Sequence, residues 1–161
     1  LIETTENKMV EEYLTKNDIK LWGLNINKNP EECKILFGWD HSGPAATRHL
    51  SIVNLVKTSY GIHVKRFKDA IVGTIGNFAK SNNIEFNKDD PLSHLRFYIN
   101  LKLIKTSFEA QVKVKLESKT DLSIMDNLEK ELKRVISENE DDFLDILKNI
   151  QEYRTLQMKP V

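Results

Sequence analysis

The apolar positions change their spacing along the chain, and each change predicts a different secondary-structure element. Between residues 63 and 80 an apolar residue recurs every three or four positions, which is the spacing of one helix face. This helical stripe consists of Val64, Phe67, Ile71, Ile75 and Phe78. Residues 95–104 alternate in polarity, which predicts a long strand, and the β-branched, apolar run Leu50–Val56 predicts another buried strand.

Weaker patterns fill in the rest of the chain. Residues 1–16 predict a short helix, and residues 18–26 and 33–39 predict two strands joined by a turn at Pro30, which together make a hairpin. Residues 111–116 predict a further β segment. From residue 120 the spacing becomes helical, with apolar stripes over 122–136 and 143–150 separated by an acidic run, so the end is either one long interrupted helix or two consecutive helices.

The order hairpin, strand, helix, strand, strand, helix predicts an α+β domain in which helices pack on one face of a mixed sheet. We divide the chain into an N-terminal helical segment (1–16), the α+β domain (17–119) and a C-terminal helix or helix pair (120–161).

Composition narrows the function classes. The 161 residues include 24 basic and 24 acidic ones, so the formal net charge of zero argues against a nucleic-acid surface spread over the whole domain. A single cysteine, Cys33, excludes an internal disulfide and a CxxC metal site. No apolar run approaches the roughly 20 residues that span a membrane. The chain starts with Leu1 rather than methionine, and we expect it to be part of a longer protein.

The segment Phe108–Leu116 carries the main candidate chemistry. It reads Phe-Glu-Ala-Gln-Val-Lys-Val-Lys-Leu and follows the long predicted strand. Lys113 offers a point charge and Gln111 a neutral hydrogen-bond donor, which together suit a phosphate group. From the residues alone, a solvated strand face explains the same pattern.

The order of residues in this segment resembles the QTK loop of the ATPase subunits of type IIA DNA topoisomerases, of the gyrase B and topoisomerase IV B-subunit kind. The family pattern is close to F-(E/D)-(G/S)-Q-T-K-x-x-L. Gln111 and Lys113 are retained, whereas Ala110 stands where Gly or Ser is usual and Val112 where Thr is usual.

A second block supports the resemblance. In the transducer domain of this family, a strand ending in Val-Asn is followed by a Gly-Gly-Thr-His loop and a helix that begins near a Phe. Here Val53-Asn54 is followed by Gly61, His63 and Phe67, with Tyr60 and Ile62 as departures. Weaker matches at 34–40 and 90–95 extend the resemblance over residues 30–150.

The resemblance implies a ribosomal S5 domain 2-like transducer domain followed by a long helix that leads toward the DNA gate. It implies that Lys113 reaches the γ-phosphate of ATP with help from Gln111, while His63 and Gly61 shape a loop. ATP and Mg²⁺ would be bound mainly by a separate GHKL domain of the same chain, so this chain alone should bind neither and be inactive.

The implied partners are that GHKL domain, a topoisomerase A-type subunit or cleavage core, DNA, and a second copy in the homodimeric enzyme, with no membrane. The implied location is the cytoplasm, at the nucleoid, or an organelle or nucleus for a eukaryotic source.

A second function also fits the lysines near this segment. The chain would then be a stand-alone S5-like module that binds RNA or protein through a basic strip of Lys102, Lys105, Lys113 and Lys115.

The neighbours Asp40, His41 and Ser42 resemble a catalytic triad only in composition, because adjacent loop residues cannot supply triad geometry. The four histidines lack metal-ligand spacing, so we expect them in packing or surface roles.

Overall fold

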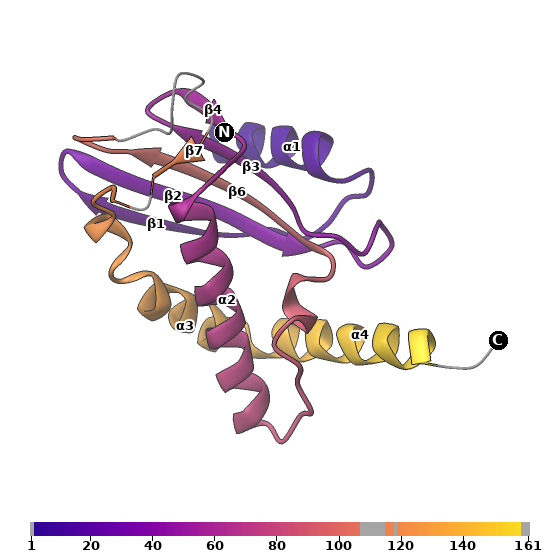
Figure 1. Ribbon diagram of the computed structural model, residues 1–161. Helices are drawn as coiled ribbons and strands as arrows, with labels where there is room; N and C mark the ends of the chain where they lie inside the picture. Colours follow the sequence, from indigo (N-terminus) through magenta and orange to yellow (C-terminus); the bar gives the residue numbers. More distant parts are fainter. Residues whose placement is uncertain (1, 107–114, 118, 159–161) are drawn as a thin grey trace.

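A five-stranded mixed sheet forms the centre of the molecule (Figure 1). The structure, a computed structural model, describes residues 2–106, 115–117 and 119–158. The strand order is β1 (Trp22–Lys28), β2 (Glu31–Trp39), β6 (Leu95–Lys102), β3 (Arg48–Val53) and β4 (Val56–Thr58). Only the β3–β6 pair is parallel, and the other neighbours are antiparallel. A short parallel pair, β5 (Tyr60–Gly61) with β7 (Lys115–Leu116), lies apart from this sheet.

Three helices cover one face of the sheet: α2 (Ile62–Ser81), α3 (Leu128–Glu138) and α4 (Glu140–Met158) (Figure 1). Short 3₁₀ turns, η1 (Asp90–Leu92) and η2 (Ser123–Met125), precede β6 and α3. The predicted α+β class with a mixed sheet and helices is confirmed. The stripe predicted for residues 63–80 is the buried face of α2, and it packs Phe67 between Phe37 and Phe97, with ring centroids 5.8 and 4.7 Å away.

The N-terminal helix α1 (Ile2–Leu14) lies on the opposite face of the sheet (Figure 1). Its Val10 and Leu14 pack against Leu36, Leu50 and Tyr98 in a second, smaller core. The helices predicted on one face are α2, α3 and α4. The segment 1–16, which is predicted as separate from the domain, adds a helical layer on the other face. Because the 40–47 loop covers Arg96 and α1 covers Tyr98, most of β6 is buried on both faces, whereas Lys102 at its end is exposed.

The strand predicted over Leu50–Val56 is divided by a tight turn. β3 ends at Val53, and Asn54 and Leu55 follow with φ of +47° and +68° before β4 returns antiparallel. Two successive residues with positive φ are typical of the turns that join twisted antiparallel strands. The apolar run concealed this turn because Leu55, unlike Gly, does not mark a left-handed backbone position.

The C-terminal segment forms two helices, the second of the two arrangements that the sequence allows. Asn139 separates them, and its side-chain Nδ2 donates to the carbonyl oxygen of Val135 over 2.8 Å. Three acidic residues, Glu140–Asp142, occupy the first turn of α4, where the helix dipole favours negative charge. Within the part of the chain that the structure describes, no helix combines the length and apolarity needed to cross a membrane.

Candidate functional site

The two predicted phosphate-facing residues, Gln111 and Lys113, lie outside the described residues. The structure does describe both flanks of their segment. The chain leaves β6 at Lys102 and continues to Thr106, and it returns at β7 (Lys115–Leu116). The candidate site is therefore defined by how the first flank is bonded to the five-stranded sheet and how the second pairs with β5.

Asn54 fastens the first flank. Its side-chain amide donates to the carbonyl oxygen of Leu103 over 3.0 Å, and its side-chain oxygen accepts from the backbone N–H of Leu103 over 2.7 Å. Its own backbone N–H donates to the carbonyl oxygen of Leu101 over 2.9 Å. Asn54 thus extends the sheet by one pairing beyond β6, because an amide side chain imitates a peptide group. The left-handed backbone of Asn54 aims its side chain at Leu103, and Asn tolerates that backbone better than most residues.

A carboxylate adds a second contact on the same flank. The backbone N–H of Ile104 donates to Glu31 Oε2 over 3.1 Å, so the β1–β2 hairpin also holds this part of the chain.

Gly61 fastens the second flank. It pairs with Leu116 in the parallel β5–β7 ladder, with φ of +155°, a backbone position that favours glycine. A Cβ at this position would lie 2.8 Å from the backbone nitrogen of Leu116 and 2.8 Å from His63 Cε1. Close approach of these two chain segments therefore requires glycine. Beside this pair, Lys115 Nζ lies 5.5 Å from the ring centroid of Tyr60, within the range of a cation–π contact.

His63 lies beneath this ladder and is fully buried at the start of α2. Its Nε2 is 2.5 Å from Ser51 Oγ, and Thr58 Oγ1 donates to the same Ser51 Oγ over 2.6 Å. Burial lowers the pKa of His63 to about 4, so the ring is neutral at pH 7. This network connects β3, β4 and α2, and it has the geometry of a structural hydrogen-bond cluster.

A second polar cluster closes the opposite end of the sheet. Asp40, almost fully buried, accepts from Ser42 Oγ over 2.9 Å, from Asn17 Nδ2 over 3.3 Å and from the Thr15 hydroxyl. Burial alone would raise the pKa of Asp40, but these hydrogen bonds and the charge of Arg96 lower it. Arg96 is fully buried and donates to the carbonyl oxygens of residues 44, 46 and 95 over 2.8, 2.5 and 3.1 Å. The cluster holds the 40–47 loop in place.

The histidines near this cluster make packing contacts. The His41 and His94 ring centroids are 5.4 Å apart, and His94 meets Tyr153 of α4 edge to face at 4.6 Å. Burial lowers the pKa of both histidines, for His41 to about 4. Within the Asp40-His41-Ser42 run, Ser42 Oγ donates directly to Asp40 Oδ1, and the His41 ring packs beside His94.

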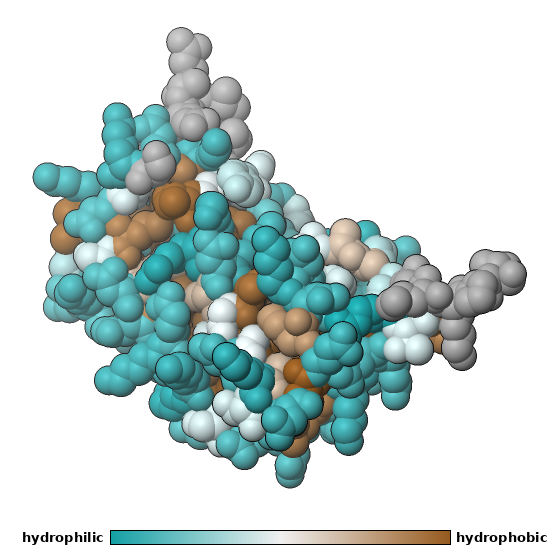
Figure 2. Space-filling view, turned by 60° about the horizontal axis from the view of Figure 1, so that its bottom comes forward, coloured by the Kyte–Doolittle hydropathy of each residue, from teal (hydrophilic) through white to brown (hydrophobic). Residues whose placement is uncertain are grey.

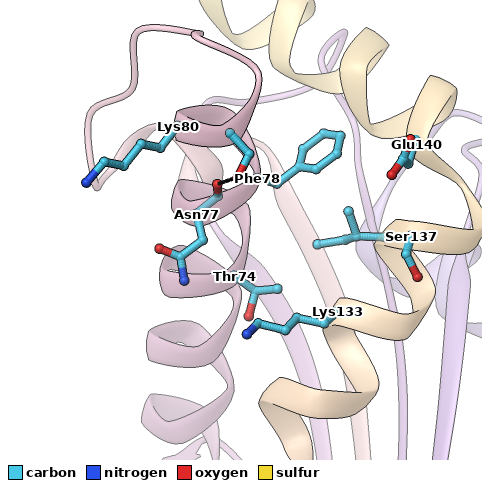
Figure 3. Close-up of a pocket in the computed structure, with 9 residues that line it drawn as sticks. Thr74, Asn77, Phe78, Lys80, Lys133, Ser137 and Glu140 are labelled. Carbon is cyan, nitrogen blue, oxygen red and sulfur yellow. Dashed lines mark hydrogen bonds between the residues drawn. The ribbon is translucent and has the colours of Figure 1, made fainter.

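A groove of about 500 Å³ separates the end of α2 from the α3–α4 junction (Figure 3). Figure 2 shows brown apolar surface among teal hydrophilic residues on the face that it presents. Lys80, Lys133 and Glu140 stand around the groove, and the Ser81 and Ser137 hydroxyls donate to carbonyl oxygens of their own helices. Gly61 and His63, the predicted residues within the described part of the chain, do not line it. Among the described residues, no group of three or more His, Cys, Asp and Glu could hold a metal ion.

Comparison with known families gives the identity of the fold. A family model for DNA gyrase B matches residues 2–159. The chain belongs to the DNA gyrase B family. No curated protein sequence matches the chain.

Solved structures agree with this family assignment. The 43K ATPase domain of Thermus thermophilus gyrase B matches with a TM-score of 0.75 and 18% identity, over 91% of this chain and 42% of its own. The ATP-binding domain of Francisella tularensis topoisomerase IV gives 0.69 and 23%, over 86% and 40%. The ATPase region of Saccharomyces cerevisiae topoisomerase II gives 0.55 and 18%, over 86% and 36%. At these identities the likeness establishes the fold, and the chain spans less than half the length of each matched structure.

Proposed function

We propose that this chain is the transducer domain of an ATP-dependent type II DNA topoisomerase. In this proposal Lys113 contacts the γ-phosphate of ATP, Gln111 assists, and ATP with Mg²⁺ is bound mainly by a separate GHKL domain. The observation that carries the proposal is that both described flanks of residues 107–114 are held by specific pairing. Asn54 holds one flank at Leu103, and Gly61 holds the other at Leu116.

The chemistry of the two side chains suits a terminal phosphate. A lysine ammonium and a glutamine amide both donate hydrogen bonds, and a donor of positive charge binds a phosphate oxygen strongly where water is excluded. In this proposal the terminal phosphate of bound ATP connects the two domains through its contact with Lys113. The connection is lost when this phosphate is released. The contribution of this chain is to hold Lys113 and Gln111 on a segment whose first flank is bonded to the five-stranded sheet at Leu103 and whose second flank pairs with β5 at Leu116.

That fastening makes a conformational switch possible. In this proposal, a displacement of residues 107–114 moves β6 through Leu103. The same displacement moves the start of α2 through Gly61 and the adjacent His63. When the terminal phosphate is lost, Lys113 loses its partner and the domain is free to rotate. A ligand shifts such an equilibrium only by its different affinity for the two states, and the Lys113 contact supplies that difference. We propose that the motion is coupled to dimer closure and DNA strand passage.

The gyrase B family match over residues 2–159 favours this proposal over a stand-alone RNA- or protein-binding module. The same family match makes the A-type subunit or cleavage core, DNA and a second copy the proposed partners in the complete enzyme.

The test is ATP turnover by the full-length protein that contains this chain, with and without DNA. We expect Lys113→Ala to lose most of the turnover while nucleotide still binds, since the rest of the ATP site is in the other domain. Lys105→Ala is the matched control, because it removes the same charge from the exposed flank of the segment. Equal turnover in wild type and Lys113→Ala would overturn the proposal.

A further inference from the structure

A small cavity lies between the last turns of α4 and the turn that precedes β6. Its volume is about 140 Å³, which is room for about four water molecules or one small ion. Two segments that are far apart in the chain line it, the turn with Asp90, Ser93 and His94, and α4 with Ile150, Tyr153 and Arg154. Apart from Ile150, every lining residue carries a polar group, so the cavity suits a polar ligand.

An ion pair joins the two sides of this cavity. Arg154 Nη1 donates to Asp90 Oδ2 over 2.7 Å, and the two side chains are only 21% and 14% exposed. Asp90 Oδ2 also accepts from the backbone N–H of Asn87 over 3.1 Å, which fixes the carboxylate. Because both contacts use Oδ2, Oδ1 is left as an acceptor for a ligand. The guanidinium likewise has further N–H donors beside the one that Asp90 accepts.

His94 contributes a buried imidazole. The residue is 2% exposed, and neither of its ring nitrogens has a hydrogen-bond partner among the described residues. Tyr153 holds the ring from α4 by an edge-to-face contact with a centroid distance of 4.6 Å. A buried polar group without a partner is unfavourable, and a ligand in the adjoining cavity would satisfy the ring. The neighbouring Ser93 hydroxyl adds a donor on the same turn.

The four polar groups together select one ligand chemistry. Arg154, Ser93 and His94 each donate a hydrogen bond, whereas the ionised Asp90 only accepts. The ligand must therefore offer several acceptor oxygens and at least one hydroxyl. Inorganic phosphate offers both, because it keeps at least one proton at neutral pH. Sulfate keeps none, so one of its oxygens would face the Asp90 carboxylate without a hydrogen bond.

We propose that this cavity binds inorganic phosphate in its hydrogen phosphate form. Arg154, Ser93 and His94 donate to the phosphate oxygens, and Asp90 accepts from the phosphate hydroxyl. The arginine contact is charge-assisted and therefore the strongest of the four. The bound ion bridges α4 and the turn before β6, so it holds this helix to the sheet. The site shares no residue with the proposed γ-phosphate contact, and neither proposal depends on the other.

The test is equilibrium dialysis of radiolabelled phosphate against the full-length protein that contains this chain. A saturating non-hydrolysable ATP analogue is present, so that a nucleotide site in another domain is filled. Unlabelled phosphate, sulfate or glycerol phosphate is then added as a competitor. We expect phosphate to displace the label at concentrations roughly ten-fold lower than sulfate, because sulfate leaves Asp90 unpaired. Glycerol phosphate is too large for the cavity and should not displace the label.

Two variants remove a donor from the site, and a third gives the matched control. Arg154→Gln should weaken retention of the label roughly ten-fold or more, and Ser93→Ala should weaken it several-fold without removing a packed side chain. Arg134→Gln should change nothing. Arg134 also pairs with carboxylates, those of Glu131 and Glu138, but on the exposed side of α3.

Asp90→Asn changes the preference of the site rather than only its affinity. The amide donates as well as accepts, so sulfate should compete about as well as phosphate in this variant. An unfolded protein cannot show such a gain of sulfate binding, so this result separates a binding role from a structural one.

Three results would overturn the proposal. The wild-type protein would retain no label once the ATP analogue is bound, or sulfate and glycerol phosphate would compete as well as phosphate. Alternatively, Arg154→Gln and Ser93→Ala would both retain the label as the wild type does.

Discussion

Replacing Asn54 by alanine tests the clamp on which the proposed mechanism depends. The change removes two side-chain hydrogen bonds, of 2.7 and 3.0 Å, to the backbone of Leu103. Each contributes about 1 kcal/mol, because water can replace part of the interaction at this partly buried site. Alanine at a φ of +47° costs about 1 kcal/mol more. We therefore expect Asn54→Ala to lower the free energy of unfolding by about 3 kcal/mol.

Two further variants divide this value into its parts. Asn54→Gly removes the amide but accepts positive φ, so we expect a loss of about 2 kcal/mol. Asn83→Ala, at the end of α2 with φ of +56°, changes the same residue type at a similar backbone position, where the described residues show no side-chain hydrogen bond. Its expected loss is only about 1 kcal/mol.

Urea denaturation monitored by circular dichroism measures these free energies, and amide hydrogen exchange reports directly on the Leu103 N–H. We expect that N–H to exchange faster in Asn54→Ala, and ATP turnover of the full-length protein to fall with it. If Asn54→Ala and Asn83→Ala cost the same, the clamp contributes nothing and the reasoning is refuted.

Three other predictions concern the same region. Gly61→Ala should destabilise the chain and expose the Leu116 amide to hydrogen exchange, because the added Cβ would lie 2.8 Å from that nitrogen. Gly73→Ala, where α2 leaves open space for a Cβ, should instead stabilise the chain by about 1 kcal/mol. Stability should fall by about 3 kcal/mol as the pH drops from 6.5 to 4, because in this range His63 binds a proton in the unfolded state whereas the buried ring, with a folded pKa of about 4, stays neutral. The slope of the urea midpoint against pH should therefore be smaller in His63→Gln. Cys33, whose pKa burial raises to about 12, should resist thiol reagents until the chain unfolds, and fast labelling of native protein would contradict its buried position.

The sequence predicts best where one local pattern decides the structure. The stripe in residues 63–80 gives α2 almost to the residue, because its five apolar side chains all belong to one packed face. The acidic run at 138–142 similarly indicates the boundary between α3 and α4.

Prediction fails where a distant partner decides. Arg96 and Tyr98 occupy the polar positions of an alternating strand, yet the 40–47 loop covers one and α1 covers the other. The alternation of β6 cannot reveal either partner, since they come from segments far away in the chain. The buried Asp40 likewise shows its role only when Thr15 and Arg96 are brought beside it.

The candidate site divides in the same way. The resemblance points to Gln111, Lys113, Gly61 and His63, and the structure brings Gly61, which pairs with β7, next to His63. The resemblance did not predict the clamp by Asn54. In the resemblance, Asn54 is only the second residue of the matched Val53-Asn54 pair. A signal was present, because Asn between two β-branched apolar runs indicates a turn, but its bond to Leu103 depends on the β3–β6 register.

The central claim is that Lys113 contacts the γ-phosphate, and the ratio of affinities for a non-hydrolysable ATP analogue and for ADP tests it most directly. In the full-length protein, Lys113→Ala should weaken binding of the analogue by about 2 kcal/mol, roughly 30-fold, and leave the ADP affinity unchanged. Lys105→Ala should change neither affinity. An equal loss for both nucleotides in Lys113→Ala, or no loss for either, would contradict the account.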